Sequence, residues 1–192
     1  MSSVETVLGP TPREKALAAA YLGSTRDELI DAVRDLSPAQ WAFQRAPGEW
    51  CAAEVVEHLA ILEGRIQMLI AMLPKAAPAE PGRNDADNDE FIIETVPRRT
   101  SRFQAPETSR PKRDCTPAEA LHLFTESRRR TGHLLETANC LRGRVVPHPV
   151  LGPWDGYQWI LAAAAHTARH TDQIREIKSA EGFPRSSAGL ET

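Results

Sequence analysis

The chain has 192 residues, of which 41% are hydrophobic and 26% charged, and its 23 basic and 26 acidic side chains give a net charge of −3. This composition excludes a disordered or membrane protein and predicts a single domain over residues 1–192, with its core at about 11–180. The small acidic excess argues against a nucleic-acid binder, and no apolar run approaches the roughly 20 residues that span a bilayer.

The expected compartment is the cytoplasm, because residues 1–10 lack the basic segment and the apolar core of a signal peptide. The three cysteines, Cys51, Cys115 and Cys140, are widely spaced and form no Cys-x-x-Cys pair. Reduced thiols are therefore expected in place of a disulfide framework. The same spacing gives no support to a cysteine metal site.

The first predicted helix spans residues 12–36 and begins with Thr11 as N-cap and a proline at the first helical position. Its apolar residues recur at helical spacing and are expected to face the core: Leu17, Ala20, Tyr21, Leu29 and Val33. Residues 39–50 then form an irregular connection, in which Trp41 and Phe43 are expected to contact the core.

The second predicted helix spans residues 51–73, and the apolar stripe that should face the core consists of Val55, Leu59, Leu62, Ile66, Leu69 and Leu73. His58 falls on this buried side. Three charged side chains are expected to face water instead: Glu57, Glu63 and Arg65. Cys51 is a poor N-cap, because a thiol replaces the oxygen that usually accepts a free amide hydrogen of the first turn.

Residues 74–116 are rich in Pro, Gly, Asp, Asn and Arg, which predicts a long, mostly irregular crossover with one short helix near 88–95. A loop of this length is unusual inside a compact domain and is typically functional or mobile. It is long enough to cross the length of a bundle, so the helices on either side are expected to be parallel neighbours.

The third predicted helix spans residues 117–137 and starts at the capping sequence Thr116-Pro117-Ala118-Glu119. Its inward residues are expected to be Leu121, Phe124, Thr131, Leu134 and Leu135. A run of three arginines, 128–130, forms a basic patch on this helix. That patch and the Arg98-Arg99 pair could bind an anionic substrate, although solvated surface charges are the favoured interpretation.

A second connection, residues 139–153, leads to the fourth helix, which Asp155 caps and which ends near Ala180. No alternating strand pattern of any length is found. The predicted fold class is therefore all-α: a four-helix bundle with a long crossover connection between helices 2 and 3.

Two histidines, His166 and His170, are four residues apart in the last helix and therefore lie one turn apart on the same face. They share a stripe with apolar residues, as His58 does in the second helix. Three inward imidazoles from two helices suit a divalent metal with an open coordination position. Burying imidazoles without partners costs free energy that a metal removes. A buried polar network of the rings, or two rings solvated in a cleft, remains the alternative.

Other polar side chains are weaker candidates. Gln173 can hydrogen-bond a ligand ring or a bound water, and packing at the helix edge explains it equally well. His122 and His133 lie beside inward leucines at boundary positions. His148 is expected in a loop, where it could approach the open end of a site, although a surface position is the favoured interpretation. The last helix does not carry a zinc-protease motif, because a threonine follows His166 where that motif requires a glutamate.

Several segments occur in a fixed order: Gly48-Glu49-Trp50, then Glu54 to Leu59, Val96 to Glu107, His148-Pro149 and Trp159 to Ile174. Together they resemble the DinB-like superfamily, which includes metal-dependent hydrolases of the YfiT type. The resemblance extends over about residues 11–180. It implies a four-helix bundle with a crossover connection and a metal triad at His58, His166 and His170.

The resemblance also implies a bacterial metalloprotein whose ion is most often zinc or nickel, because relatives have been associated with these and other divalent ions. Some relatives are transferases or isomerases that use a low-molecular-weight thiol. We therefore expect metal-dependent hydrolysis, or transfer of a thiol co-substrate, on a small-molecule substrate, with water or thiolate at the open position. No protein side chain is assigned a catalytic role.

Two other functions stay open. The chain could be a stress-related binding or scaffold protein in which the metal only ties helices together, and a fourth position closed by a protein side chain would favour this. It could also be a degenerate family member that keeps the histidines without binding metal. A homodimer is compatible with the sequence but is not required by it.

Overall fold

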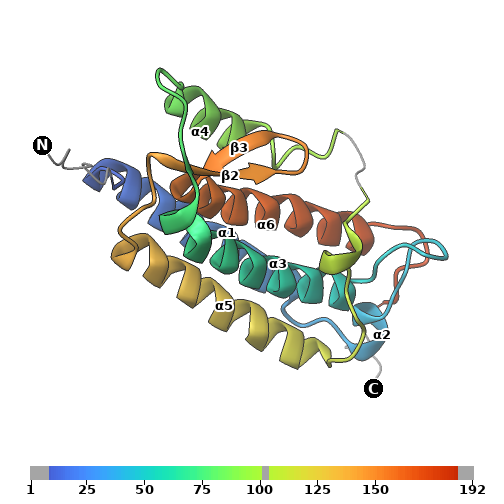
Figure 1. The fold of residues 1–192 in the computed structure, drawn as a ribbon. Helices are drawn as coiled ribbons and strands as arrows, with labels where there is room; N and C mark the ends of the chain where they lie inside the picture. The colour runs from blue at the N-terminus through green and yellow to red at the C-terminus, as the bar shows by residue number, and fades with distance from the viewer. Residues whose placement is uncertain (1–8, 101–103, 186–192) are drawn as a thin grey trace, which may run out of the picture.

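A computed structural model describes residues 9–100 and 104–185, and four long helices form its frame (Figure 1). These are α1 (Pro12–Val33), α3 (Ala52–Met72), α5 (Pro117–Thr137) and α6 (Gly156–Lys178). Helix α3 packs against α5 and α6, and α1 packs against the same two helices from the other side. The four-helix bundle with a long crossover between α3 and α5 is therefore confirmed.

The helices on either side of the crossover run in the same direction, as their colours in Figure 1 show, and α1 and α6 run in the opposite one. The prediction of parallel neighbours is confirmed, because α3 and α5 also pack directly on each other. The crossover contains η1 (Leu73–Lys75), β1 (Ala77–Pro78), α4 (Asp85–Glu94) and η2 (Glu107–Ser109). Helix α4 is the short helix that the sequence predicts near residues 88–95.

Capping residues start the helices where the sequence places them. Thr11, Thr116 and Asp155 each accept a hydrogen bond from the backbone N–H three residues later, and the side chain at that position bonds back. Helix α1 ends at Val33 rather than Leu36, because Ser37 caps a further short helix, α2 (Pro38–Trp41). The predicted irregular connection therefore begins with one helical turn.

A small antiparallel sheet lies beside the bundle, which the sequence analysis does not predict. Strand β2 (Arg144–His148) pairs with β1 on one side and with β3 (Gly152–Asp155) on the other, with Val146 opposite Trp154. The hairpin of β2 and β3 and helix α4 cover α6 (Figure 1). The strands of this sheet are short and contain prolines, so they show no alternating hydrophobic pattern from which the sequence would predict them.

The buried face of α1 is rotated from the predicted one. Leu17 is 44% exposed, whereas Ala18 and Leu22 are buried. The contact with α5 and α6 follows residues 18, 22, 25 and 29, which succeed one another at intervals of one helical turn. The prediction that Leu17 and Ala20 face the core is wrong, because apolar spacing alone allowed either of two adjacent stripes.

A polar layer separates two apolar clusters inside the bundle. One cluster surrounds Tyr157 and Ile160, and the other surrounds Phe124 and Ile174. The layer between them contains buried polar groups from all four long helices: Thr25, Glu63, Ser127, Arg128, Thr131, Thr167 and Thr171. None of the helices within the described ranges combines the length and apolarity that a bilayer span requires.

Two charged residues in this layer correct the sequence analysis. Glu63 is 2% exposed and Arg128 is 3% exposed, and Arg128 Nε donates to Glu63 Oε1 at 2.7 Å. The sequence predicts that Glu63 faces water and that Arg128 belongs to a solvated patch. Both expectations are wrong, because each charge finds its partner on another helix, which the local pattern of charges does not reveal.

Candidate metal centre

Three histidines from two helices converge in the bundle. The Nε2 atom of His166 lies 3.0 Å from Nε2 of His58 and 3.0 Å from Nε2 of His170. His58 is 3% exposed and His170 is 8% exposed, whereas His166 is half-buried. The structure therefore brings together the three side chains that the sequence selected, and His166 is the most exposed of them.

The outer ring nitrogens of two histidines have fixed partners. His58 Nδ1 lies 2.6 Å from the backbone oxygen of Ser109, and His170 Nδ1 lies 2.8 Å from Gln173 Oε1. Arg99 Nη1 donates to the same Gln173 oxygen at 3.5 Å, which fits an oxygen there because arginine only donates. Since carbonyl oxygens only accept, both rings carry their proton on Nδ1 and leave Nε2 with a free lone pair.

The arrangement of the Nε2 atoms fits a divalent ion. The unprotonated Nε2 atoms of His58 and His170 both face Nε2 of His166. That atom carries at most one proton, so it can donate a hydrogen bond to only one of the two lone pairs at a time. Ligand nitrogens about 2.0–2.1 Å from a tetrahedral ion lie about 3.3 Å from each other, close to the separations here. An imidazole that binds a metal through one nitrogen usually donates its other N–H to an oxygen, as His58 and His170 do.

Burial favours the neutral, ligand form of all three rings. It lowers the pKa of His58, although the hydrogen bond to the Ser109 backbone opposes this. Burial also lowers the pKa of His166 and His170 well below the ordinary value, and the neighbouring imidazoles add to the effect. Protons therefore compete weakly for these nitrogens at neutral pH.

Part of the long crossover positions His58. Ser109 is buried at the end of η2, and its carbonyl meets the ring. The following backbone is anchored to α3, because the Glu57 carboxylate accepts from the N–H groups of Lys112 and Arg113 at 2.7 and 3.0 Å. The prediction that Glu57 faces water is wrong: it is 6% exposed, and backbone amides stabilise its charge.

Trp50 covers one side of the cluster. Its ring centre lies 4.9 Å from that of His58 and 6.3 Å from that of His170. Trp50 and Ser109 are site residues that the sequence does not predict. A signal for Trp50 was its position directly before the helix of His58, whereas a backbone carbonyl acceptor such as that of Ser109 has no signature in sequence.

The paired arginines of the crossover have protein partners. Arg99 donates from Nε and Nη2 to the two carboxylate oxygens of Glu176, at 2.8 and 3.1 Å. The same guanidinium reaches Gln173, so it links the crossover to the residue that holds His170. Arg98 is exposed and pairs with Glu94. These contacts favour a structural role for Arg99 over the binding of an anionic substrate.

The remaining histidines differ in exposure. His122 and His133 are exposed on α5. His148 is half-buried at the end of β2, where its ring centre lies 4.3 Å from that of Trp154. The expectation that His148 lies in a loop is wrong, because it ends strand β2, and the hairpin packs one side of the ring onto an aromatic cluster.

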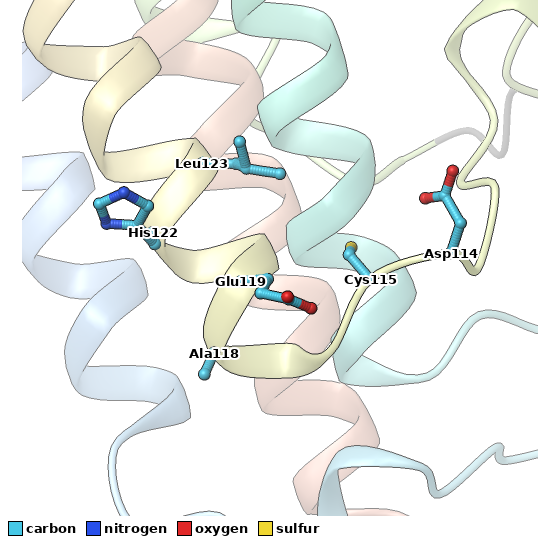
Figure 2. A pocket seen from close by; sticks show the side chains of 6 residues that line it. All are labelled: Asp114, Cys115, Ala118, Glu119, His122 and Leu123. Atoms are coloured by element: carbon cyan, nitrogen blue, oxygen red, sulfur yellow. The ribbon is translucent and has the colours of Figure 1, made fainter.

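An open hollow of about 510 Å³ lies elsewhere, along the outer side of the first turns of α5. Figure 2 shows that its lining side chains, which include Asp114, Glu119 and His122, spread over the surface and do not converge on one point. The ligand atoms of Glu57, Asp114 and Cys115 lie close together nearby, but the Glu57 carboxylate is already engaged by backbone amides. The histidine cluster is the better candidate site.

The fold and this cluster define a class of protein: an all-helical bundle with three interior imidazoles whose geometry suits a divalent ion. A family model described as the DinB superfamily matches residues 21–174. The chain belongs to the DinB superfamily.

Two similar proteins come from Bacillus subtilis. The uncharacterised protein YuaE of strain 168 is 25% identical over 161 residues, which cover 83% of this chain and 96% of YuaE. The solved structure of YfiT, described as a probable metal-dependent hydrolase with an unusual four-helix bundle topology, matches with a TM-score of 0.60 and 18% identity. That match covers 93% of this chain and 91% of YfiT, and it shows that the fold is shared.

Proposed function

We propose that the protein is a metal-dependent hydrolase that acts on a small molecule through a divalent ion held by His58, His166 and His170. The observation that carries the proposal is the convergence of three Nε2 atoms, two of which are unprotonated because their Nδ1 atoms donate to carbonyl oxygens. The description of YfiT as a probable metal-dependent hydrolase supports it by analogy of fold.

An open coordination position favours an enzyme over a scaffold. Among the described residues, no carboxylate, thiol or further imidazole joins the three mutually close ligand atoms. His166 is the most exposed of the three, and we infer that a small molecule approaches from its side. A bound divalent ion would supply Lewis acidity that activates water and polarises the bond under attack.

The protein's own residues keep the ligands oriented and neutral. Ser109 and Gln173 fix the tautomers of His58 and His170, and Trp50 shields these rings from water on one side. Arg99 holds the Gln173 amide in place through its pairing with Glu176. These contacts preorganise the three nitrogens, so little order has to be created when an ion binds.

The first test is metal content. Purified protein is expected to hold about one zinc or nickel ion per chain by elemental analysis, and His58→Ala, His166→Ala and His170→Ala are each expected to lose it. His133→Ala, at an exposed position on α5, is the matched control and keeps the ion. Gln173→Ala keeps the ligands but is expected to bind the ion about 10- to 100-fold more weakly. Unchanged metal content in the three ligand variants would contradict the proposal.

The second test separates hydrolysis from thiol transfer. The loaded protein is screened against activated esters and amides, with and without a low-molecular-weight thiol. Turnover that needs no thiol and is lost in His166→Ala supports the hydrolase. Turnover that appears only with thiol assigns the transferase instead, and stoichiometric metal without either activity assigns the scaffold role.

A further inference from the structure

Three aromatic rings form a cluster between the β2–β3 hairpin and α6. The ring centre of His148 lies 4.3 Å from that of Trp154 and 5.4 Å from that of Trp159, and the two indoles are 5.1 Å apart in an edge-to-face arrangement. Trp154 and Trp159 are almost fully buried, whereas His148 is half-buried. The cluster lies outside the set of residues that hold His58, His166 and His170.

The aromatic cluster lies along the same face of α6 as His166. Trp159 precedes His166 by seven residues in the same helix, so both side chains project from the same face, two turns apart. His166 is also the most exposed of the three proposed ligands.

His148 presents a hydrogen-bond donor in this cluster. Its Nδ1 atom accepts from the backbone N–H groups of Val150 and Leu151, at 3.2 and 3.0 Å. Both donors come from the hairpin turn, so the turn fixes the tautomer of the ring. The proton of the neutral imidazole therefore resides on Nε2, which can only donate.

Trp159 presents a second donor, and it lacks an acceptor. Its indole Nε1 is buried, in a residue that is 6% exposed, and it has no hydrogen-bond partner among the described residues. Buried N–H groups are nearly always paired, because leaving one unpaired costs free energy. An unpaired donor of this kind, on the helix face that carries His166, is a group that a ligand could satisfy.

We propose that His148 and Trp159 form a substrate subsite that donates two hydrogen bonds to a carboxylate or carbonyl oxygen of a flat, unsaturated small molecule. The rings of the cluster supply apolar surface for such a skeleton, and the donors supply its recognition. The statement that a molecule held here is a substrate of the metal centre rests on the proposed function. The subsite itself depends only on residues of the hairpin and of α6.

The probe for this subsite is benzoate, which carries a carboxylate on a flat ring. The four indole N–H signals of the ¹⁵N-labelled protein are assigned from single Trp→Phe variants and followed during a benzoate titration. The Trp159 signal is expected to move downfield and to saturate, in metal-free and in zinc-loaded protein alike. The Trp41 signal, from the far end of α2, is the internal control and stays in place.

Variants test each donor separately. Trp159→Phe keeps an aromatic ring without the N–H, and His148→Phe does the same for the imidazole. Each is expected to weaken benzoate binding about tenfold, because one hydrogen bond to a charged acceptor is lost. Trp41→Phe leaves the affinity unchanged. Perchlorate at the same ionic strength, a poor acceptor, leaves the Trp159 signal unmoved.

Three outcomes overturn the subsite: a Trp159 signal that benzoate does not move, a Trp41 signal that moves equally, or an unchanged affinity in Trp159→Phe. The first would mean that the indole N–H is satisfied internally, by the face of Trp154. The metal-free arm separates this result from the proposed function. Failure of the metal centre would appear as missing zinc while the benzoate response persists.

Discussion

Removing the buried guanidinium of Arg128 is expected to destabilise the whole bundle. All five of its N–H groups have acceptors: Glu63 and Leu22 O, Thr25 Oγ1, Ala163 O and Thr167 Oγ1. These acceptors lie on α1, α3 and α6, so a single side chain from α5 connects the other three long helices. Arg128→Met keeps most of the volume of the side chain but leaves the Glu63 carboxylate buried without its counter-charge.

The expected magnitude follows from this burial. Breaking a buried ion pair by removing one partner costs about 3–5 kcal/mol, because the remaining charge stays desolvated. For a protein of this size the corresponding fall in Tm is roughly 6–20 °C. Urea denaturation followed by circular dichroism measures the free energy of unfolding, and calorimetry measures the Tm.

The neighbouring residue provides the matched control. The Arg129 side chain is 68% exposed and pairs with Glu126 on its own helix, so Arg129→Met is expected to change stability by less than about 0.5 kcal/mol. Adding Glu63→Leu to Arg128→Met is expected to recover part of the loss, since the orphaned charge is then removed. A loss below about 1 kcal/mol in Arg128→Met alone would refute the reasoning, because it would mean that residue 128 is solvated.

Two further predictions concern the histidine cluster and the start of α6. Burial lowers the pKa of His166 and His170, so below about pH 6.5 the unfolded chain binds protons that the folded chain excludes, and metal-free protein loses up to about 1.4 kcal/mol per pH unit for each ring. Urea titrations from about pH 8 to pH 5 check this, and a slope no smaller in His166→Ala would contradict it. A Cβ on Gly156 would lie 2.5 Å from Leu73 Cδ1, so Gly156→Ala is expected to cost about 1–3 kcal/mol. Gly132→Ala meets no atom within 4 Å and is expected to gain up to about 1 kcal/mol, and equal effects of the two changes would rule out the steric argument.

The start of each long helix could be predicted because capping is local. In each capping box two side chains bond to each other's backbone within four residues, as in Thr116 with Glu119 and Asp155 with Gln158. The motif can therefore be recognised in the sequence without knowledge of the fold. The start of α2 shows the limit of this approach. Ser37 and Gln40 form the same motif and start a helix within the segment 37–41, where the sequence predicts the end of the first helix and an irregular connection.

The polar interior could not be predicted from local pattern. Glu57, Glu63 and Arg128 look like surface charges in a helical repeat, yet each is buried against a partner at least 50 residues away in the chain. Burial of a charge is decided by whether such a partner exists at the right place. The pairing of β1 with β2 could not be predicted either. Such short segments are not stable as strands alone, and they come together only when the bundle has formed.

The sequence by itself determined the helices, their direction through the long crossover and the pairing of His166 with His170, because these follow from the 3.6-residue helical repeat, from capping and from loop length. Only the tertiary structure decided three features: the distance from His58 to that pair, the Ser109 carbonyl that fixes the tautomer of His58, and the unpaired indole N–H of Trp159. These features join segments far apart in the chain, and their energies depend on burial and on the partners that the packed helices and loops supply.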